Sequence, residues 1–102
     1  MAYDAEEGPE YHRITEILGC RWSLAIFDVL EQGSSRPSQL DKAIDGANPR
    51  VLRRCLTRLE KDGLLHREVL AKMPPHVEYS LSDKGRRLNG LLKDLRRLAS
   101  DW

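Results

Sequence analysis

Residues 48–65 have the sequence of one amphipathic helix with a recognisable start and end, and this segment constrains the fold more than any other. Asn48 is a good N-cap because its side chain can accept a hydrogen bond from an unpaired backbone N–H, and Pro49 suits the first helical position, where no N–H is needed. Gly63 is typical of a helix end. Apolar side chains recur every three or four residues and predict a buried face, formed by Leu52, Cys55, Leu56 and Leu59.

The remaining face of this helix is basic. It carries Arg50, Arg53, Arg54, Thr57, Arg58 and Lys61. A helix that gives its apolar face to the core and presents arginine on the other face suits the major groove of duplex DNA. Arginine-rich faces also occur on ordinary solvated helices, so the interpretation depends on the rest of the chain.

Charge is distributed unevenly along the 102 residues, although the net charge is only +1. Residues 1–10 contain four acidic and no basic residues, whereas residues 50–61 contain five basic residues and a single glutamate. Such segregation creates a local positive field that can attract a polyanion. A nucleic-acid partner is therefore indicated by the placement of charge and not by its total.

Several classes of protein are disfavoured. No apolar run approaches the ~20 residues that a membrane span needs, and the acidic N-terminus does not resemble a secretion signal. Two cysteines without a CxxC pair argue against a zinc site or a disulfide framework, and a reducing cytoplasm is the expected location. His12, His66 and His76 share no ligand spacing, and no phosphate-binding loop or nucleophile–base motif is present. We expect no metal, no cofactor and no enzymatic activity.

The pattern along the chain predicts a mobile acidic tail over 1–10 and a single domain over 11–102. Helices are expected over 11–19, 22–32, 37–44 and 48–62, and the short turn containing Gly46 makes the last two a helix-turn-helix. Residues 64–70 and 77–81 are expected to form strands, because Val77, Tyr79 and Leu81 alternate with polar residues. The proline-containing segment between them makes a hairpin, over about 64–82, that follows the basic helix directly.

A final helix is expected over 83–102. Its apolar residues are spaced three and four apart and form a seam of Leu88, Leu91, Leu95, Leu98 and Trp102. The seam extends beyond the cover that a small core can provide, which favours contact with a second copy of the chain. The alternative is that the helix packs back on its own core.

Specific motifs go beyond this order of elements: ILGCRW at 17–22, RPSQL at 36–40, NPRVLRRCLTRLEKDGLL at 48–65 and MPPHVEYSLSDKGRRL at 73–88. Over about residues 11–100 the chain resembles the HxlR-type family of bacterial transcriptional regulators. The resemblance implies a mainly α-helical winged helix-turn-helix with a small β-hairpin, in which a three-helix core and wing are extended by additional N- and C-terminal helices. It also implies a homodimer formed through the first and last helices, with an interface of Tyr11, Ile14, Leu18, Leu88, Leu91, Leu95, Leu98 and Trp102.

In this reading the protein binds a pseudo-palindromic operator in double-stranded DNA, with residues 48–62 in the major groove and the wing on the backbone or in the minor groove. The expected DNA contacts are Arg36, Ser38, Asn48, Pro49, Arg50, Arg53, Arg54, Thr57, Arg58, Arg67, Lys72 and His76. One or two of Arg50, Arg53 and Arg54 are expected to read bases, because arginine can bond guanine O6 and N7 together.

Two alternatives stay open at this point. Cys20 lies beside Arg21, and a neighbouring positive charge can make a thiol reactive, which would give an oxidant- or ligand-responsive regulator; packing is its other role. Cys55 is expected to be an inert core residue. The sequence departs from the family where Gly19-Cys20-Arg21-Trp22 replaces the usual Gly-Gly-Lys-Trp, and residues 1–19 lack the cysteine with which some members sense oxidants. The second alternative is a winged-helix adaptor that binds protein instead of DNA.

Overall fold

The computed structural model describes residues 8–19 and 22–102 of the chain. Within them the elements follow the order α1 (Pro9–Gly19), α2 (Ser23–Glu31), α3 (Pro37–Ala43), α4 (Pro49–Lys61), β1 (Leu65–Lys72), β2 (Pro75–Leu81) and α5 (Asp83–Ser100). The structure is the predicted mainly helical winged helix-turn-helix with a two-stranded antiparallel hairpin. Helix α1 begins at Pro9, two residues before the predicted start, so Pro9 and Glu10 belong to a helix and not to a tail.

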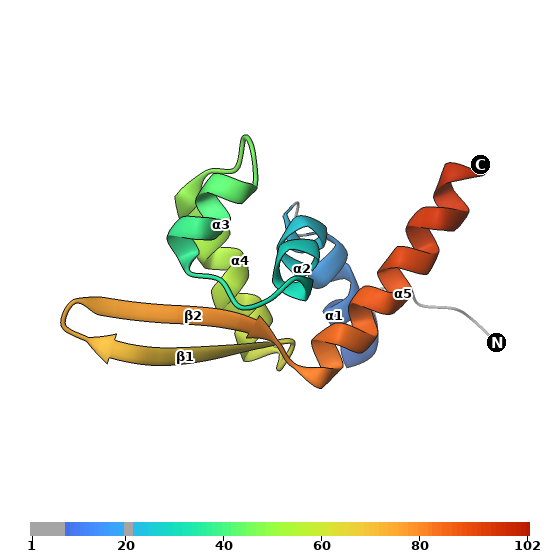
Figure 1. Ribbon diagram of the computed structural model, residues 1–102. Helices are drawn as coiled ribbons and strands as arrows, with labels where there is room; N and C mark the ends of the chain where they lie inside the picture. Colours follow the sequence, from blue (N-terminus) through green and yellow to red (C-terminus); the bar gives the residue numbers. More distant parts are fainter. Residues whose placement is uncertain (1–7, 20–21) are drawn as a thin grey trace.

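The core lies where α2, α3 and α4 meet the base of the hairpin (Figure 1). The predicted apolar face of α4 is buried in full, and it packs with the buried residues of the other elements, which include Ile26, Phe27 and Leu30 of α2, Leu40 of α3, and Leu65 and Leu81 of the hairpin. Each fully buried leucine or isoleucine stabilises the fold by about 1.5–3 kcal/mol relative to an exposed one. This packing fixes the side of α4 that remains available to a partner.

Both ends of α4 are capped as predicted. The Asn48 side chain accepts a hydrogen bond from the backbone N–H of Arg50 at 2.8 Å. At the other end Gly63 has φ +78°, and the N–H groups of Gly63 and Leu64 donate to the carbonyls of Glu60 and Leu59, at 2.9 Å each. This Schellman arrangement stops the helix and turns the chain directly into β1.

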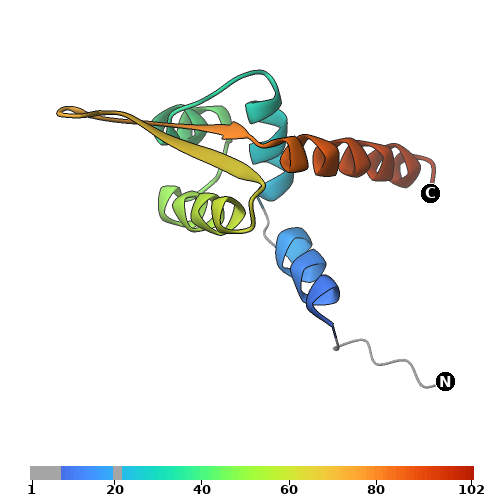
Figure 2. The same ribbon diagram turned by 90° about the horizontal axis from the view of Figure 1, so that it is seen from below.

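The hairpin has the predicted extent, but its strands continue further toward the tip than the sequence pattern predicted. Strand pairing runs from Leu65 opposite Leu81 to Lys72 opposite Pro75, with an irregularity between Val69 and Ala71. Residues 71–72 and 75–76, predicted to lie in a loop, therefore belong to strands. Pro75 is tolerated because it begins its strand, where a missing N–H costs little. The hairpin projects from the body as an extended wing in both views (Figures 1 and 2).

Helix α5 projects from the opposite side of the body, and α1 lies apart from it in Figure 2. Leu88 and Leu92 near the start of α5 pack on the core, whereas the rest of the helix extends past it. The molecule measures 57 × 30 × 26 Å, and its radius of gyration of 15.1 Å exceeds the ~13 Å of a compact chain of 100 residues. None of the helices in the described part of the chain has the length and apolar character to cross a membrane.

Candidate nucleic-acid interface

The solvent-facing side of α4 forms an open basic hollow of about 480 Å³. It is lined by the predicted basic face, that is by Arg50, Arg53, Arg54, Thr57, Arg58 and Lys61, all of which are exposed. No acidic residue lines the hollow. The helix therefore presents a concave, positively charged surface while its apolar side is held in the core.

The arginines of this face are not equivalent. Arg53 Nη1 donates to Asp41 Oδ1 of α3 at 2.7 Å and to the carbonyl of Pro49 at 3.3 Å. The hydrogen bond to Asp41 raises the pKa of Arg53 above its ordinary value. Arg50 and Arg54 make no ion pair with any residue of ranges 8–19 and 22–102. Arg53 thus joins the two helices of the helix-turn-helix, while Arg50 and Arg54 keep their guanidinium groups available.

A second basic site lies where the wing meets the start of α3. Ser35 and Tyr79 exchange backbone hydrogen bonds at 3.0 and 2.8 Å, which holds the segment before α3 against β2. As a result Arg36 contacts His76, with Nε to Nε2 at 3.0 Å and Nη2 to Nδ1 at 3.1 Å. Next to this contact is a hollow of about 300 Å³, lined by Arg36, Pro37, Ser38, Arg53, Pro75 and Val77. Arg36 and Ser38, predicted from the sequence, are thereby brought to one site with Arg53.

Ser34 and Glu78 complete this site, and no local pattern in the sequence points to either of them. His76 Nε2 lies 2.9 Å from Glu78 Oε2, and the Ser34 hydroxyl donates to Glu78 Oε1 at 2.6 Å. These bonds lower the pKa of Glu78, with the Ser34 hydroxyl contributing most and His76 less. Ser34 and Glu78 are 44 residues apart, and the adjoining Ser35–Tyr79 bridge holds their segments side by side.

The remaining predicted DNA contacts are more dispersed. Arg67 and Lys72 are exposed along β1 and line neither hollow. Asn48 and Pro49 are exposed at the start of α4, where the Asn48 side chain is engaged as a cap. No three side chains of metal-binding types gather anywhere in the part of the chain that the structure describes.

A separate apolar surface runs along α5. Leu91, Leu98 and Trp102 are 66%, 58% and 87% exposed, and Leu95 and Ile14 of α1 are also exposed. The alternative in which this seam packs on its own core is therefore wrong for all of its members except Leu88, which is half-buried against the core. The side chains of Tyr11 and Leu18 lie outside the described residues.

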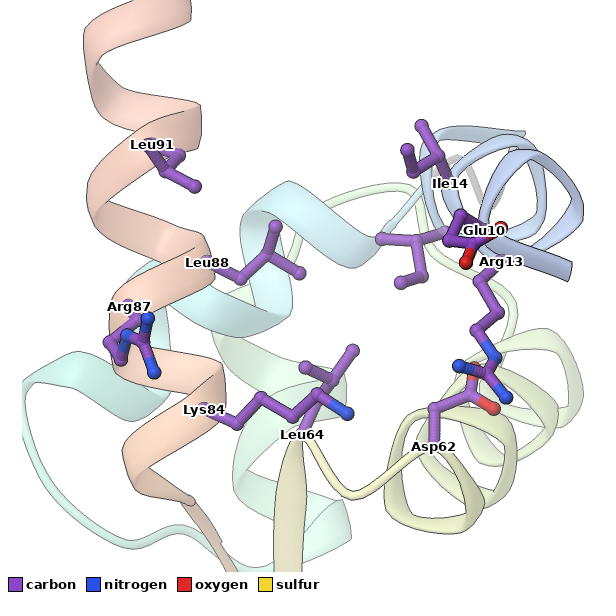
Figure 3. A pocket seen from close by; sticks show the side chains of 10 residues that line it. Glu10, Arg13, Ile14, Asp62, Leu64, Lys84, Arg87, Leu88 and Leu91 are labelled. Atoms are coloured by element: carbon purple, nitrogen blue, oxygen red, sulfur yellow. The ribbon is translucent and has the colours of Figure 1, made fainter.

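Between α1, α5 and the turn after α4 the same surface is hollowed (Figure 3). The hollow measures about 380 Å³. Its apolar lining comes from Ile14, Ile17, Leu64, Leu88 and Leu91, and its charged lining from Glu10, Arg13, Asp62, Lys84 and Arg87. The apolar face of α1 thus lies across from that of α5 with a gap between them, and among the described residues nothing covers Ile14 and Leu91.

Cys55 is buried, with 7% of its surface exposed, as the sequence predicted. It is disulfide-bonded, however, which corrects the expectation of an inert core thiol and of a chain without disulfides. The chain has one other cysteine, Cys20, and the predicted role of Cys20 falls outside the described residues. The spacing of two isolated cysteines contained no signal for this bond.

Comparison with known proteins identifies the fold family. The model of the family described as HxlR-like helix-turn-helix matches residues 17–102. The chain belongs to this family. An HxlR-like relative, the uncharacterised HTH-type transcriptional regulator YvaP of Bacillus subtilis (strain 168), is 35% identical over 98 residues, which are 96% of this chain and 91% of YvaP. The HxlR-like chain is accordingly a DNA-binding transcriptional regulator of the winged-helix type, which favours this class over the adaptor and over an enzyme.

Solved structures agree with the assignment to the HxlR-like family. A transcriptional regulator described as a MarR-family member from Enterococcus faecalis V583 is 34% identical with a TM-score of 0.76, covering 98% of this chain and 93% of its own. The reduced form of the regulator YodB from B. subtilis is 27% identical with a TM-score of 0.81, covering 94% of both chains. The winged helix with its additional terminal helices is thus shared by proteins with about a third or less of their residues in common.

Proposed function

We propose that this HxlR-like protein acts as a homodimer that binds a pseudo-palindromic operator, with α4 in the major groove and the wing on the flanking backbone or minor groove. The observation that supports this most is the concave basic face of α4, which has no acidic lining residue and no competing use in the core. A major groove about 12 Å wide accepts one helix in this manner.

The proposed roles of the site residues follow from whether each side chain is already bonded to another residue of the described chain. Arg50 and Arg54 have no ion-pair partner among the residues that the structure describes, and they are proposed to read bases. Arg53 is bonded to Asp41 and is proposed to contact phosphate, as is Arg36. The other proposed backbone contacts are Ser38, Asn48, Pro49, Thr57, Arg58, Arg67, Lys72 and His76. Phosphate contacts of this kind supply much of the affinity and make it dependent on salt.

The homodimer is proposed from the uncovered apolar surface of α1 and α5. Three large apolar residues of α5, Leu91, Leu95 and Leu98, face solvent on a helix that leaves the body, and Trp102 is exposed two residues beyond the helix end at Ser100. A twofold dimer through this surface would present two copies of α4 to successive major grooves, about one helical turn apart.

The test begins with selection of bound duplexes from a random pool, followed by affinity measurements on Arg50→Ala, Arg54→Ala and the control Arg97→Ala. Loss of a bidentate arginine–guanine contact is worth about 1–3 kcal/mol, or roughly 5- to 150-fold in affinity, and relaxes the preference at one base pair. Arg97→Ala removes the same charge from an exposed position on α5, and binding should change less than about twofold. Unchanged affinity and base preference in both Arg50→Ala and Arg54→Ala would contradict the proposal.

A second function, redox-responsive regulation, is favoured by the disulfide at Cys55. YodB has been solved in reduced, diamide-treated and quinone-bound forms. Cys55 lies on the buried side of α4, so formation or loss of its disulfide acts on the helix that carries the basic face. Cys20 is the proposed partner thiol. With hydrogen peroxide as oxidant the two thiols lose two electrons and two protons, the S–S bond forms, the O–O bond breaks and two water molecules leave.

This redox proposal is tested by operator binding before and after peroxide treatment, with recovery by a dithiol reductant. The native protein should change affinity reversibly, whereas Cys55→Ser and Cys20→Ser should not respond. A response that persists in Cys55→Ser, or none in the native protein, would exclude the bond as a switch.

A further inference from the structure

Four side chains link the wing to the segment before α3: Ser34, Arg36, His76 and Glu78. We call this group the Arg36 latch. Ser34 donates to one oxygen of Glu78 and His76 contacts the other, at 2.6 and 2.9 Å. Both nitrogens of the His76 ring lie near the guanidinium of Arg36, at 3.0 and 3.1 Å. These contacts hold His76 of the wing against Arg36, which is more than a wing surrounded only by solvent requires.

The position of the hydrogen on the His76 ring decides which of these contacts can be hydrogen bonds at the same time. The ionised Glu78 carboxylate can only accept, so the contact of His76 Nε2 with Glu78 Oε2 requires a hydrogen on Nε2. Nε2 then has no lone pair for Arg36 Nε, so the hydrogen bond that the heavy-atom geometry allows from Arg36 Nε to Nε2 at 3.0 Å belongs to the other tautomer. The unprotonated Nδ1 is left as the acceptor for Arg36 Nη2 at 3.1 Å. The consistent arrangement is a neutral His76 that accepts from Arg36 and donates to Glu78.

We propose that Ser34 and Glu78 are positioning residues that act through neutral His76 to hold the Arg36 guanidinium beside the phosphate-contacting hollow, and that protonation of His76 releases Arg36. This inference rests on the proposed DNA-binding function. A doubly protonated imidazole has two donors and no acceptor, so it cannot bond a guanidinium, which has donors only. The contact between His76 and Glu78 survives protonation, whereas the contact with Arg36 does not.

The charged groups around His76 come from every element packed there. Arg36 faces it from the segment before α3, and Glu78 from its own strand. Across the adjoining hollow Arg53 of α4 is paired with Asp41 of α3. On β1, Lys72 is opposite Pro75 and Glu68 is opposite Glu78. Only the contact between Arg36 and His76 joins two groups that are both donors once the ring is protonated, so this contact is the one that protonation breaks.

Holding Arg36 matters because an unrestrained arginine loses side-chain entropy when it binds phosphate. An arginine already held in place loses less, and the difference corresponds to roughly two- to tenfold in affinity. The contribution of Arg36 to binding should therefore be larger when His76 is neutral. A simple charge effect gives the opposite or no trend, because added positive charge at low pH strengthens DNA binding without changing what Arg36 contributes.

The experiment measures the affinity of the full chain for the selected duplex at fixed salt, with and without Arg36→Ala, first in the native protein and then in variants of His76 and Glu78. The factor by which Arg36→Ala weakens binding is measured at about pH 8 and about pH 5.5, on either side of the range in which histidine ordinarily titrates. We expect this factor to be roughly two- to tenfold larger at the higher pH. The native and Arg36→Ala proteins both retain His12 and His66, so contributions from these two residues cancel in the ratio of their affinities.

Substitutions at His76 provide matched controls. The glutamine side chain has an accepting oxygen and a donating NH2 group and does not titrate, so in His76→Gln the factor by which Arg36→Ala weakens binding should stay large at both pH values. In His76→Ala and Glu78→Ala it should be small at both. An Arg36 factor that is the same at both pH values in the native background, or a His76→Gln variant that behaves like His76→Ala, overturns the proposal.

A DNA-free measurement separates this proposal from the proposed function. Nuclear magnetic resonance of the imidazole nitrogens in the protein alone should show the His76 hydrogen on Nε2 at about pH 8, and Glu78→Ala should reduce that preference. A hydrogen on Nδ1 overturns the latch even if DNA binds. Conversely, failure of the native protein to bind any duplex, with the Nε2 form present, contradicts the DNA-binding function and leaves the latch intact.

Discussion

Gly85 and Gly90 lie on the same helix, but packing requires a glycine only at the first. A Cβ on Gly85 would lie 2.1 Å from the backbone oxygen of Leu64, which also accepts a hydrogen bond from the N–H of Ser82. We expect Gly85→Ala to lower the free energy of unfolding by about 2–3 kcal/mol, because the base of the wing must move away from α5. Urea unfolding of the variant measures this loss.

Gly90→Ala is the matched control. Apart from the adjoining backbone of α5, no atom of the described residues lies within 4 Å of a Cβ built at Gly90, so alanine should stabilise α5 by about 0.5–1 kcal/mol through its higher helix propensity. We therefore expect the free energy of unfolding to fall in Gly85→Ala and to rise in Gly90→Ala. If Gly85→Ala were as stable as the native protein, the close approach of α5 to Leu64 would be wrong.

At the residue scale, the sequence predicted which side of a helix is buried better than it predicted which side chains bond to one another. Leu52, Cys55, Leu56 and Leu59 were assigned correctly to the core, because a helical period reports which side of a helix is apolar. The bond between Arg53 and Asp41 and that between Ser34 and Glu78 join residues 12 and 44 positions apart. Such contacts arise from tertiary packing, which no local pattern encodes. The same limit explains why the disulfide at Cys55 was not expected.

At the scale of elements, α5 is fastened to α2 by charge as well as by apolar contact. Arg96 donates to both oxygens of Asp28 at 2.6 and 3.0 Å, and Lys93 pairs with Glu31. The hydrogen bonds from Arg96 hold the pKa of Asp28 below its ordinary value. A carboxyl group with a lowered folded-state pKa stabilises the fold above its unfolded pKa of ~3.9, and this contribution is lost as the pH falls through the folded pKa.

We therefore expect Asp28→Asn to lower the free energy of unfolding at pH 7 and to have a progressively smaller effect as the solution is acidified below about pH 4. Both side chains are about 40% exposed, which limits the loss at pH 7 to about 1 kcal/mol or less. Asp94→Asn is the control, since Asp94 pairs with Arg97 on the exposed side of the same helix. An equal loss of unfolding free energy in Asp28→Asn and Asp94→Asn would show that the ion pair between α2 and α5 stabilises the fold no more than an exposed pair within α5.

The elements themselves were predicted in type and order, and their ends differed where pairing competes with local preference. The two prolines at 74 and 75 predicted a loop over 71–76, yet cross-strand pairing continues to Lys72 and Pro75. Proline forbids helix interior but does not forbid the first position of a strand. Helix α4 has caps encoded in its own sequence, and its observed bounds, Pro49–Lys61, lie within one residue of the predicted ones.

At the scale of the whole molecule, the wing and α5 extend from opposite sides of the core (Figure 1). The side chains of Leu91, Leu95 and Leu98 on α5 are exposed. If the native protein forms the proposed dimer, we expect Leu98→Asp to give a monomer at the same concentration, because a carboxylate buried without a partner opposes association. Analytical ultracentrifugation measures this directly. Leu70→Asp places the same charge on an exposed leucine of the wing and should leave the dimer intact. A dimeric Leu98→Asp variant would place the interface elsewhere.

The salt dependence of DNA binding then connects the dimer with the basic face of α4. Each phosphate neutralised by the protein adds about −0.9 to the slope of log K against log salt concentration. A dimer carries two copies of α4 and of the Arg36 hollow, whereas the Leu98→Asp monomer carries one of each. Its slope on a single half-site should therefore be about half that of the native protein on the full operator, while its preferred bases stay the same. A monomer that kept the full slope would mean that one copy makes all of the phosphate contacts, and that the second copy of α4 does not reach the DNA.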